Sequence, residues 1–286
     1  MKILITGANG MLAQAVKEKF KEGNKLILTD VNDLDITNNN AVMEFVAKEK
    51  PEYIINCAAY TAVDKAEENE ELAEKINAEG PKNLALAAKE NDAILIHIST
   101  DYVFPGDLDV SKTYKEEDKT GPVTAYGRTK LHGEQAIINN CEKYYIFRTA
   151  WLYGEGKNFV RTMLALSENN DEISVVCDQH GSPTYTEDLT SIIYQAIEKN
   201  IPFGIYHSTN QRFTTWSEFT KKIFELSNIK TKVNPITSEE YSRKYPTSAN
   251  RPKNSQLSKE KLTNNGIEIP SWEDALKRYL KKEGKM

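Results

Sequence analysis

Residues 2–13 read KILITGANGMLA, an apolar strand pattern that passes through a glycine-containing turn into a helical pattern. Gly7 permits a tight turn, and Gly10 lets the backbone approach a pyrophosphate, which the N-terminus of a helix attracts. Ala13 stands where a third glycine often packs helix against strand, and alanine is an accepted small substitute. Similar turns also occur for packing alone. Following the first strand, this turn indicates a dinucleotide-binding unit.

The same alternation continues through the first half of the chain. Apolar runs occur at residues 3–5, 26–28, 53–56, 94–98 and 144–147, with helical patterns between them. The runs are apolar throughout, which is typical of parallel strands covered by helices on both faces. We therefore predict an α/β fold with a Rossmann-type doubly wound parallel sheet. Such sheets bind ligands at the carboxyl ends of their strands.

The pattern loosens after about residue 150. Residues 201–286 are richer in polar side chains, and their apolar residues are irregularly spaced. We assign residues 1–150, together with about 171–200, to a dinucleotide-binding Rossmann domain. We assign residues of about 151–170 and 201–286 to a smaller C-terminal substrate-binding lobe.

Composition excludes several classes of protein. The 286 residues carry a net charge of −5 without a block of five basic residues, which argues against a nucleic-acid binder. No stretch approaches the ~20 apolar residues of a membrane span, and the N-terminal apolar run is too short for a signal peptide. The three cysteines and four histidines show neither a disulfide framework nor zinc-ligand spacing. We expect a cytoplasmic protein that contacts no membrane and no nucleic acid.

Further residues extend the predicted dinucleotide site. Asp30 follows the second apolar run, about 20 residues past the glycines, where an acid bonds the adenosine ribose hydroxyls. A carboxylate there repels a 2′-phosphate, which favours NADH over NADPH, although Asp30 could also be a solvated turn acid. Residues 56–61 end the third run with small side chains that leave room for a cofactor. The predicted cofactor-binding residues are Gly7, Gly10, Met11, Leu12, Asp30, Asp35, Ile36, Ala58, Ala59, Tyr60, Thr61, Tyr126 and Lys130.

Three residues indicate acid–base chemistry. Tyr126 and Lys130 stand four residues apart in a predicted helix, so they share one face. A phenol of pKa about 10 is a poor acid–base group at neutral pH, and a nearby ammonium lowers that pKa. Thr100 follows the fourth apolar run, where its hydroxyl could bond the substrate oxygen that Tyr126 protonates. Each signal alone also occurs for structural reasons, but together they predict a hydride-transfer site.

Together these motifs resemble those of the extended short-chain dehydrogenase/reductases. Within that superfamily, four segments closely resemble the dTDP-4-dehydrorhamnose reductase family. They read AYTAVDKAE at 59–67, STDYVF at 99–104, RTAWLYG at 148–154 and DQHGSPT at 178–184. The segment RPKNSQL at 251–257 resembles a late Arg-Pro motif of that family. The resemblance covers nearly the whole chain and is strongest before residue 190.

The resemblance implies a reaction. Members of the family reduce the C4 ketone of dTDP-4-dehydro-6-deoxy-L-mannose (dTDP-4-dehydrorhamnose) to dTDP-L-rhamnose with NADH or NADPH, in nucleotide-sugar and cell-surface polysaccharide biosynthesis. By this resemblance Tyr126 is the proton donor, Lys130 orients the ribose and tunes Tyr126, and Thr100 bonds the reacting oxygen. Thr100, Asp101 and Trp151 are then expected to contact the sugar, and Arg251 the diphosphate.

The resemblance also bears on metal and assembly. Some family members bind a magnesium ion between subunits through glutamate side chains. Ala15 stands near the helix start, where such a glutamate is needed, and Glu187 alone leaves the set incomplete. We therefore expect no essential metal, and leave a homodimer open.

Alternative functions remain on the same scaffold. Sugar-nucleotide 4,6-dehydratases carry a Thr-Asp-Glu pattern, whereas in this sequence Tyr102 follows Thr100 and Asp101. Epimerases usually have a longer substrate lobe than residues 201–286. A non-catalytic NAD(P)-binding regulatory subunit of the same family is a third alternative, which only an assay separates from an enzyme.

Overall fold

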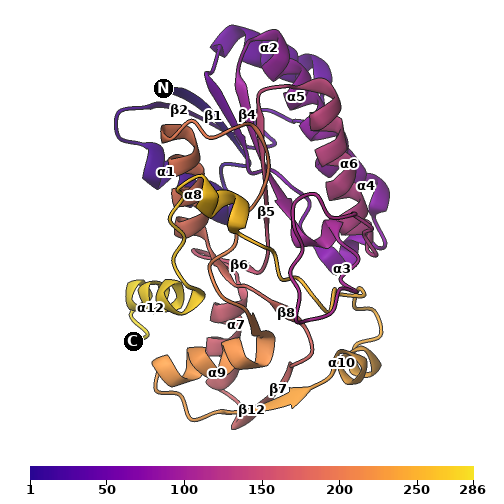
Figure 1. Cartoon of the computed structure of the whole chain (residues 1–286), viewed down its shortest axis with the longest axis vertical. Coiled ribbons are helices and arrows are strands. Elements are labelled where there is room, and N and C mark those ends of the chain that lie inside the picture. The colour runs from indigo at the N-terminus through magenta and orange to yellow at the C-terminus, as the bar shows by residue number, and fades with distance from the viewer.

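Six parallel strands form the central sheet of the computed structural model, which describes residues 1–286 (Figure 1). Their spatial order is β10 (Gly204–His207), β5 (Tyr144–Thr149), β4 (Ile94–Thr100), β3 (Tyr53–Asn56), β1 (Lys2–Thr6) and β2 (Lys25–Thr29). The chain goes from β1 to β2 at one edge and then returns to β3 on the other side of β1. This reversal places a ligand crevice at the carboxyl ends of β1 and β3.

Helices cover both faces of this sheet. One face carries α1 (Met11–Phe20) and α8 (Thr186–Glu198), and the other carries α2 (Asn39–Glu49), α5 (Gly80–Glu90) and α6 (Ala125–Asn140). Ile3 and Ile5 belong to the first core and Leu4 to the second, and all three are fully buried. Because β1 is buried on both sides, its sequence is apolar at consecutive positions. The predicted Rossmann-type doubly wound sheet is confirmed.

A smaller lobe lies below the sheet in Figure 1 and has a core of its own. Three helices, α7 (Phe159–Ser167), α9 (Trp216–Leu226) and α12 (Trp272–Lys282), pack with the parallel pair β7 (Glu172–Val176) and β12 (Lys232–Ile236). Aromatic side chains fill this core. Tyr153 and Tyr279, for example, meet edge to face with ring centroids 5.2 Å apart.

Short elements connect these layers. They are α3 (Val63–Ala66), α4 (Glu70–Glu74), the π-helical η1 (Lys75–Glu79), the 3₁₀-helical η2 (Asp101–Val103), β6 (Leu152–Tyr153), β8 (His180–Gly181), β9 (Thr184–Tyr185), β11 (Thr214–Thr215), α10 (Ser238–Lys244) and α11 (Glu260–Asn264). η2 follows β4 directly and brings the segment after that strand against α6. Nowhere does the chain form a helix with both the length and the apolarity needed to cross a membrane.

Two segments differ from the partition expected from the sequence. β7 was expected to join the Rossmann domain, but it pairs with β12 in the smaller lobe. β10 was expected in the smaller lobe, but it pairs with β5 as the edge strand of the central sheet, where Tyr206 is fully buried. Leu262, within α11, joins the same core as Ile3. We propose that residues 186–207 and α11 belong with the sheet domain.

Candidate active site

The turn after β1 passes very close to the end of β3. Gly7 has φ +63°, and a Cβ added there would lie 2.7 Å from the backbone nitrogen and Cα of Ala58. Glycine is therefore required by both conformation and space. Gly10 precedes α1 and provides no capping side chain, so N–H groups of the first turn of the helix stay available to an anion.

A cavity of about 300 Å³ lies at this turn. Asp30 borders it, and its carboxylate accepts hydrogen bonds from the backbone N–H groups of Asn9 at 3.0 Å and Val31 at 2.8 Å. Seven of the predicted cofactor residues line it: Gly7, Gly10, Asp30, Asp35, Ile36, Ala58 and Ala59. The remaining lining residues are Cys57, which belongs to the predicted small-residue run 56–61, and four that the sequence did not indicate: Val31, Leu34, Thr37 and Ile76.

The other six predicted cofactor residues lie elsewhere; Tyr126 and Lys130 are described below. Leu12 is 6% exposed and packs in the core beneath the sheet. Met11 borders a different hollow between α1, α8 and α12. Tyr60 packs on the small cluster around α3, with its backbone bonded to the Asn77 side chain, and Thr61 is exposed. The small-residue motif at 56–61 thus lines the cavity only at its start.

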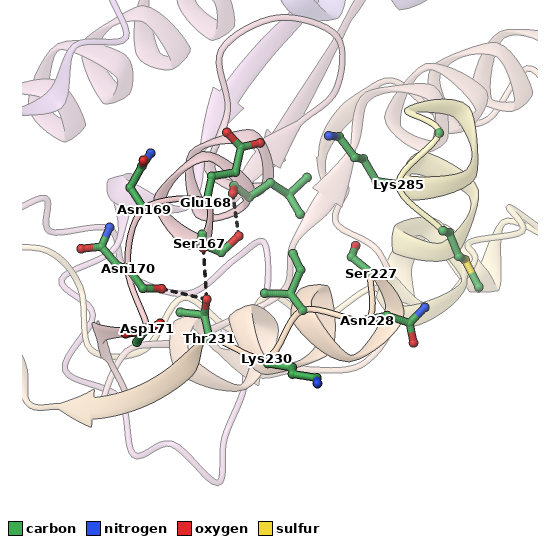
Figure 2. Close-up of a pocket in the computed structure, with 14 residues that line it drawn as sticks. Ser167, Glu168, Asn169, Asn170, Asp171, Ser227, Asn228, Lys230, Thr231 and Lys285 are labelled. Atoms are coloured by element: carbon green, nitrogen blue, oxygen red, sulfur yellow. Dashed lines mark hydrogen bonds between the residues drawn. The ribbon is translucent and has the colours of Figure 1, made fainter.

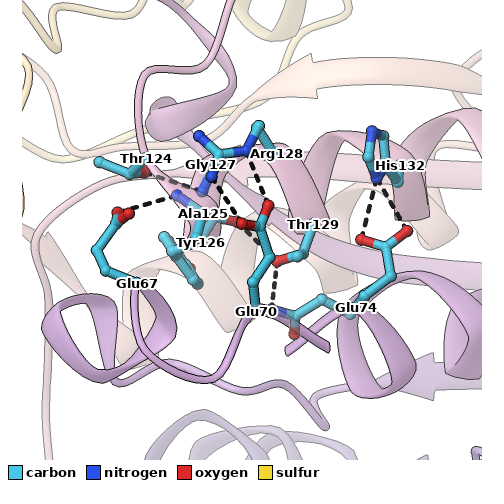
Figure 3. A network of polar contacts seen from close by, with 11 residues as sticks. Glu67, Glu70, Glu74, Thr124, Ala125, Tyr126, Gly127, Arg128, Thr129 and His132 are labelled. Atoms are coloured by element: carbon cyan, nitrogen blue, oxygen red, sulfur yellow. Dashed lines mark hydrogen bonds and ion pairs between the residues drawn. The ribbon is translucent and has the colours of Figure 1, made fainter. Parts of the chain in front are cut away.

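The N-terminus of α6, which carries Tyr126, is firmly held (Figure 3). Thr124 caps the helix by accepting a hydrogen bond from the Gly127 N–H at 3.0 Å, and Glu67 accepts one from the Ala125 N–H at 3.0 Å. Two pairs tie the next turns to α4: Arg128 with Glu70, and His132 with Glu74. These contacts fix the direction in which the Tyr126 side chain leaves the helix.

Tyr126 lies beside Thr100 and Tyr102. Its ring meets that of Tyr102 edge to face, with centroids 5.5 Å apart. Burial raises the pKa of the Tyr126 phenol above its ordinary value, and a hydrogen bond with Thr100 acts in the opposite direction. The phenol is therefore protonated at neutral pH, which is the form that a proton donor needs.

Lys130 lies on α6 one turn after Tyr126, and its side chain is 2% exposed. Nζ donates to the Ile98 carbonyl oxygen at 2.7 Å and lies 3.2 Å from His97 Nε2. Burial lowers the pKa of Lys130 to about 8. His97 was not predicted as a site residue, because a histidine inside an apolar strand gives no signal of its neighbours.

Asp101 is buried, and both of its carboxylate oxygens have partners. Oδ1 accepts from the Thr100 hydroxyl at 2.9 Å, and Oδ2 accepts from the Ser255 hydroxyl. Burial raises the pKa of Asp101 to about 6. The carboxylate thus joins the segment after β4 to the late Arg-Pro segment. Its expected contact with a sugar is not visible in this arrangement.

Trp151 lies in the smaller lobe against Trp216. The two rings stack with centroids 3.8 Å apart, and a Cβ on Gly181 would lie 2.8 Å from the Trp151 ring. Trp151 also has φ +50°, a conformation that is uncommon for a bulky residue. Trp216, which the sequence did not indicate, borders the neighbouring cavity, whereas Trp151 supports it from behind.

A cavity of about 670 Å³ separates the smaller lobe from the end of β4. Tyr102, Trp216 and Arg251 border it, with apolar side chains of α7 and β7. Arg251 donates to both carboxylate oxygens of Asp64, at 2.9 and 3.0 Å, and to the Tyr102 hydroxyl at 3.3 Å. The cavity therefore combines aromatic and apolar walls with two cations, Arg251 and Lys244, a composition suited to a ligand with a ring and an anionic group.

The largest hollow, of about 1030 Å³, lies elsewhere in the smaller lobe (Figure 2). The loops after α7 and α9 and the C-terminal residues line it with mostly polar groups. Thr231 joins the two loops by donating to the backbone oxygens of Ser167 and Asn170. None of the predicted site residues borders this hollow.

Glu187 and Ala15, the two positions that the resemblance relates to a magnesium ion, lie on the same hollow. Glu187 accepts a hydrogen bond from Lys282 Nζ at 2.7 Å, and Ala15 borders the same hollow. No group of three or more histidine, cysteine, aspartate or glutamate side chains in the chain is placed to hold a metal ion.

Comparisons with known proteins place the chain among relatives of one kind. A family model described as the RmlD substrate binding domain matches residues 1–284. The dTDP-4-dehydrorhamnose reductase of Salmonella typhimurium is 39% identical over 296 residues, which covers 98% of this chain and 97% of that relative.

Solved structures agree. The crystal structure of a dTDP-4-dehydrorhamnose reductase from Clostridium acetobutylicum superimposes with a TM-score of 0.94 at 47% identity, covering 99% of this chain and 100% of that chain. The enzyme of the same name from Bacillus anthracis, solved in complex with NADP, has a TM-score of 0.93 at 42% identity, covering 98% and 99%.

These matches extend over both lobes, from the glycine turn to α12. They confirm the resemblance that the motifs of the sequence indicated. The chain belongs to the dTDP-4-dehydrorhamnose reductase family, a family of oxidoreductases.

Proposed function

We propose that the chain reduces the C4 ketone of dTDP-4-dehydrorhamnose to dTDP-L-rhamnose, with a hydride from a reduced nicotinamide dinucleotide. One observation carries this proposal: the Tyr126–Lys130 pair lies near residues that border two cavities. Tyr126 packs on Tyr102, which borders the 670 Å³ cavity. Lys130 lies near enough to Cys57, which borders the cavity at the glycine turn, for its charge to lower the pKa of that thiol.

The residues around the glycine turn fit a dinucleotide. Gly7 passes close to Ala58 and leads to the uncapped start of α1, and together they form a cradle for a pyrophosphate. The carboxylate of Asp30 can accept hydrogen bonds from a ribose. When bound, the cofactor supplies the hydride. The protein supplies binding, orientation and the proton.

Tyr126 is the proton donor in this proposal. As hydride adds to C4, the carbonyl electron pair moves onto oxygen, and the Tyr126 hydroxyl transfers its proton there, leaving a phenolate. The one hydroxyl proton of Thr100 is directed at Asp101. To stabilise the phenolate that forms, and so to lower the pKa of Tyr126, this proton must turn from Asp101 to the Tyr126 oxygen.

The larger cavity is proposed to hold the nucleotide-linked sugar. Arg251 is one of its two cations and is suited to a diphosphate, because a guanidinium bonds phosphate oxygens in pairs. Asp64 already occupies two of its N–H groups, so a diphosphate must share or displace that carboxylate. Trp216, supported by Trp151, offers an aromatic face to a ring.

The test is cofactor oxidation that depends on a nucleotide-linked 4-keto sugar, followed by the absorbance of reduced nicotinamide. Tyr126→Phe should lower kcat by about 10²–10⁴-fold and leave the Kd for the cofactor unchanged, because only the proton is removed. Tyr194→Phe, on α8 outside both cavities, is the matched control. Wild-type turnover by Tyr126→Phe would contradict the mechanism.

A panel of dTDP-, UDP- and GDP-linked 4-keto sugars tests the substrate. The dTDP compound should give the highest kcat/KM. If the protein binds the cofactor but reduces none of the panel, the non-catalytic binding subunit becomes the better interpretation.

We also propose that NADH is preferred over NADPH. The Asp30 carboxylate borders the cavity, and a 2′-phosphate beside it would be repelled. Asp30→Ser should raise kcat/KM for NADPH relative to NADH by about tenfold or more, the ratio that corresponds to ~1.4 kcal/mol. Asp33→Asn is the control on the same loop. A wild-type enzyme that prefers NADPH would refute this proposal.

A further inference from the structure

Polar side chains form a row across three neighbouring strands, from the last residues of β1 and β3 to the middle of β4. Thr6 on β1, Asn56 on β3 and His97 on β4 stand directly opposite one another in the strand register. All three are buried, and the row ends at Lys130 Nζ. No ligand-binding role assigned above requires Asn56 or His97.

Asn56 determines which nitrogen of His97 carries a proton. Oδ1 of Asn56 accepts from the backbone N–H of Ala58 at 3.1 Å and from the Thr6 hydroxyl at 2.7 Å. Because the Ala58 N–H can only donate, the amide cannot be reversed. Its Nδ2 therefore faces His97 Nδ1, at 3.0 Å. An amide nitrogen only donates, so Nδ1 must accept.

His97 then directs its own proton at Lys130. Burial lowers the pKa of His97 well below its ordinary value, so the ring is neutral and its single proton lies on Nε2. Nε2 is 3.2 Å from Lys130 Nζ. An ammonium has only donors and would meet this N–H donor to donor. A neutral amine accepts the Nε2 proton and still donates to the Ile98 oxygen.

We propose that Asn56 and His97 are positioning residues that shift the protonation equilibrium of Lys130 toward the amine in the cofactor-free protein. The other titratable groups that act on Lys130 are Glu134 on its own helix and Cys57 after β3, and both favour the charged form. Burial opposes them and is the larger effect, lowering the pKa of Lys130 to about 8. The fixed tautomer of His97 works in the same direction as burial.

This proposal concerns the protein without cofactor and does not depend on the proposed reaction. A lysine that titrates close to physiological pH can offer either a lone pair or a proton to the hydroxyl groups of a bound ligand. The row Thr6–Asn56–His97 would then determine how readily Lys130 changes between its amine and ammonium forms.

The test is a pH titration of the full chain labelled with ¹³C and ¹⁵N in lysine and histidine, followed by NMR. In wild type the Lys130 ε-carbon signal should have its midpoint at or below about pH 8, whereas surface lysines titrate near about 10.4. Lys130→Met identifies the signal. Lys259→Met identifies the other buried lysine, whose pKa burial lowers to about 7.

Asn56→Leu removes the amide donor that fixes the tautomer of His97, and it adds no charge. His97 can then present an unprotonated Nε2, so the Lys130 midpoint should rise by about one pH unit or more, a tenfold change in the protonation equilibrium. Thr6→Val removes the other side-chain partner of Asn56 but leaves the tautomer fixed, so its midpoint should match wild type. Equal midpoints in Asn56→Leu and wild type would overturn the proposal.

Histidine ¹⁵N shifts of the wild type provide a second measurement, which does not depend on the Asn56→Leu variant. His97, identified by the loss of its signal in His97→Asn, should carry its proton on Nε2. A proton on Nδ1, or a Lys130 midpoint near that of the surface lysines, would also overturn the proposal. Loss of catalytic activity alone would not bear on it.

Discussion

Replacing Asp101 by asparagine isolates the cost of a buried carboxylate beside the proton donor. Asp101 is 3% exposed, and burial raises its pKa from 3.8 to about 6. The folded pKa is the higher one, so this group stabilises the fold below pH 3.8 and loses that contribution as pH rises through about 6. The total is about 3 kcal/mol, from a pKa difference near 2 and 1.36 kcal/mol for each pH unit.

The assay is urea unfolding of wild type and Asp101→Asn at several pH values between 4 and 7. The free energy of unfolding of wild type should fall relative to the variant by roughly 2 kcal/mol over this range, since part of the loss lies below pH 4. Asp171→Asn, an exposed aspartate, is the control and should show no such trend. A constant difference between wild type and Asp101→Asn would refute the reasoning.

Two further predictions concern stability around the same site. Arg148 and Glu134 form a buried pair, with both side chains at most 3% exposed and 2.7 Å between Nη2 and Oε2. Arg148→Met should lower the free energy of unfolding, measured by chemical denaturation, by about 3–5 kcal/mol, because it leaves the Glu134 charge buried without a partner. The double variant Arg148→Met/Glu134→Leu should lose clearly less, and equal losses in the two variants would contradict this prediction. A Cβ on Gly127 would meet the Tyr102 carbonyl oxygen at 2.3 Å, so Gly127→Ala should cost about 1–3 kcal/mol and lower kcat. Gly121→Ala is the control: a Cβ there would have its nearest neighbours at 3.8 Å, so neither the stability nor kcat should change. Equal thermal midpoints for wild type, Gly127→Ala and Gly121→Ala would contradict the prediction.

Much of the fold was predictable because its central strands are buried on both faces. The sequences of β1, β3 and β4 contain nearly continuous apolar runs, a pattern that is found in few other kinds of structural element. β10 has only four residues, and β7 is buried at one end only, so their sequences do not distinguish the central sheet from the smaller lobe. Their placement depends on pairing between segments far apart in the chain.

The candidate site divides in the same way. Gly7 and Gly10, or Tyr126 and Lys130, are close in sequence, so helix and turn geometry bring them together predictably. The contact between Asp101 and Ser255 joins residues 154 positions apart. The contact between Asn56 and His97 requires that β3 and β4 be neighbours in one register. Local patterns carry no information about such contacts.

The edge position of β10 has a consequence for synthesis of the protein. After β5 the chain enters the smaller lobe, returns with α8 and β10, leaves again for α9, comes back at α11 and ends in α12 (Figure 1). The core under the sheet includes Ile267, and the core of the smaller lobe includes Leu280. Neither of these two cores is complete until residues 267 and 280 have been synthesised. The two lobes are therefore expected to complete their folding together, once the segment that contains α12 is available.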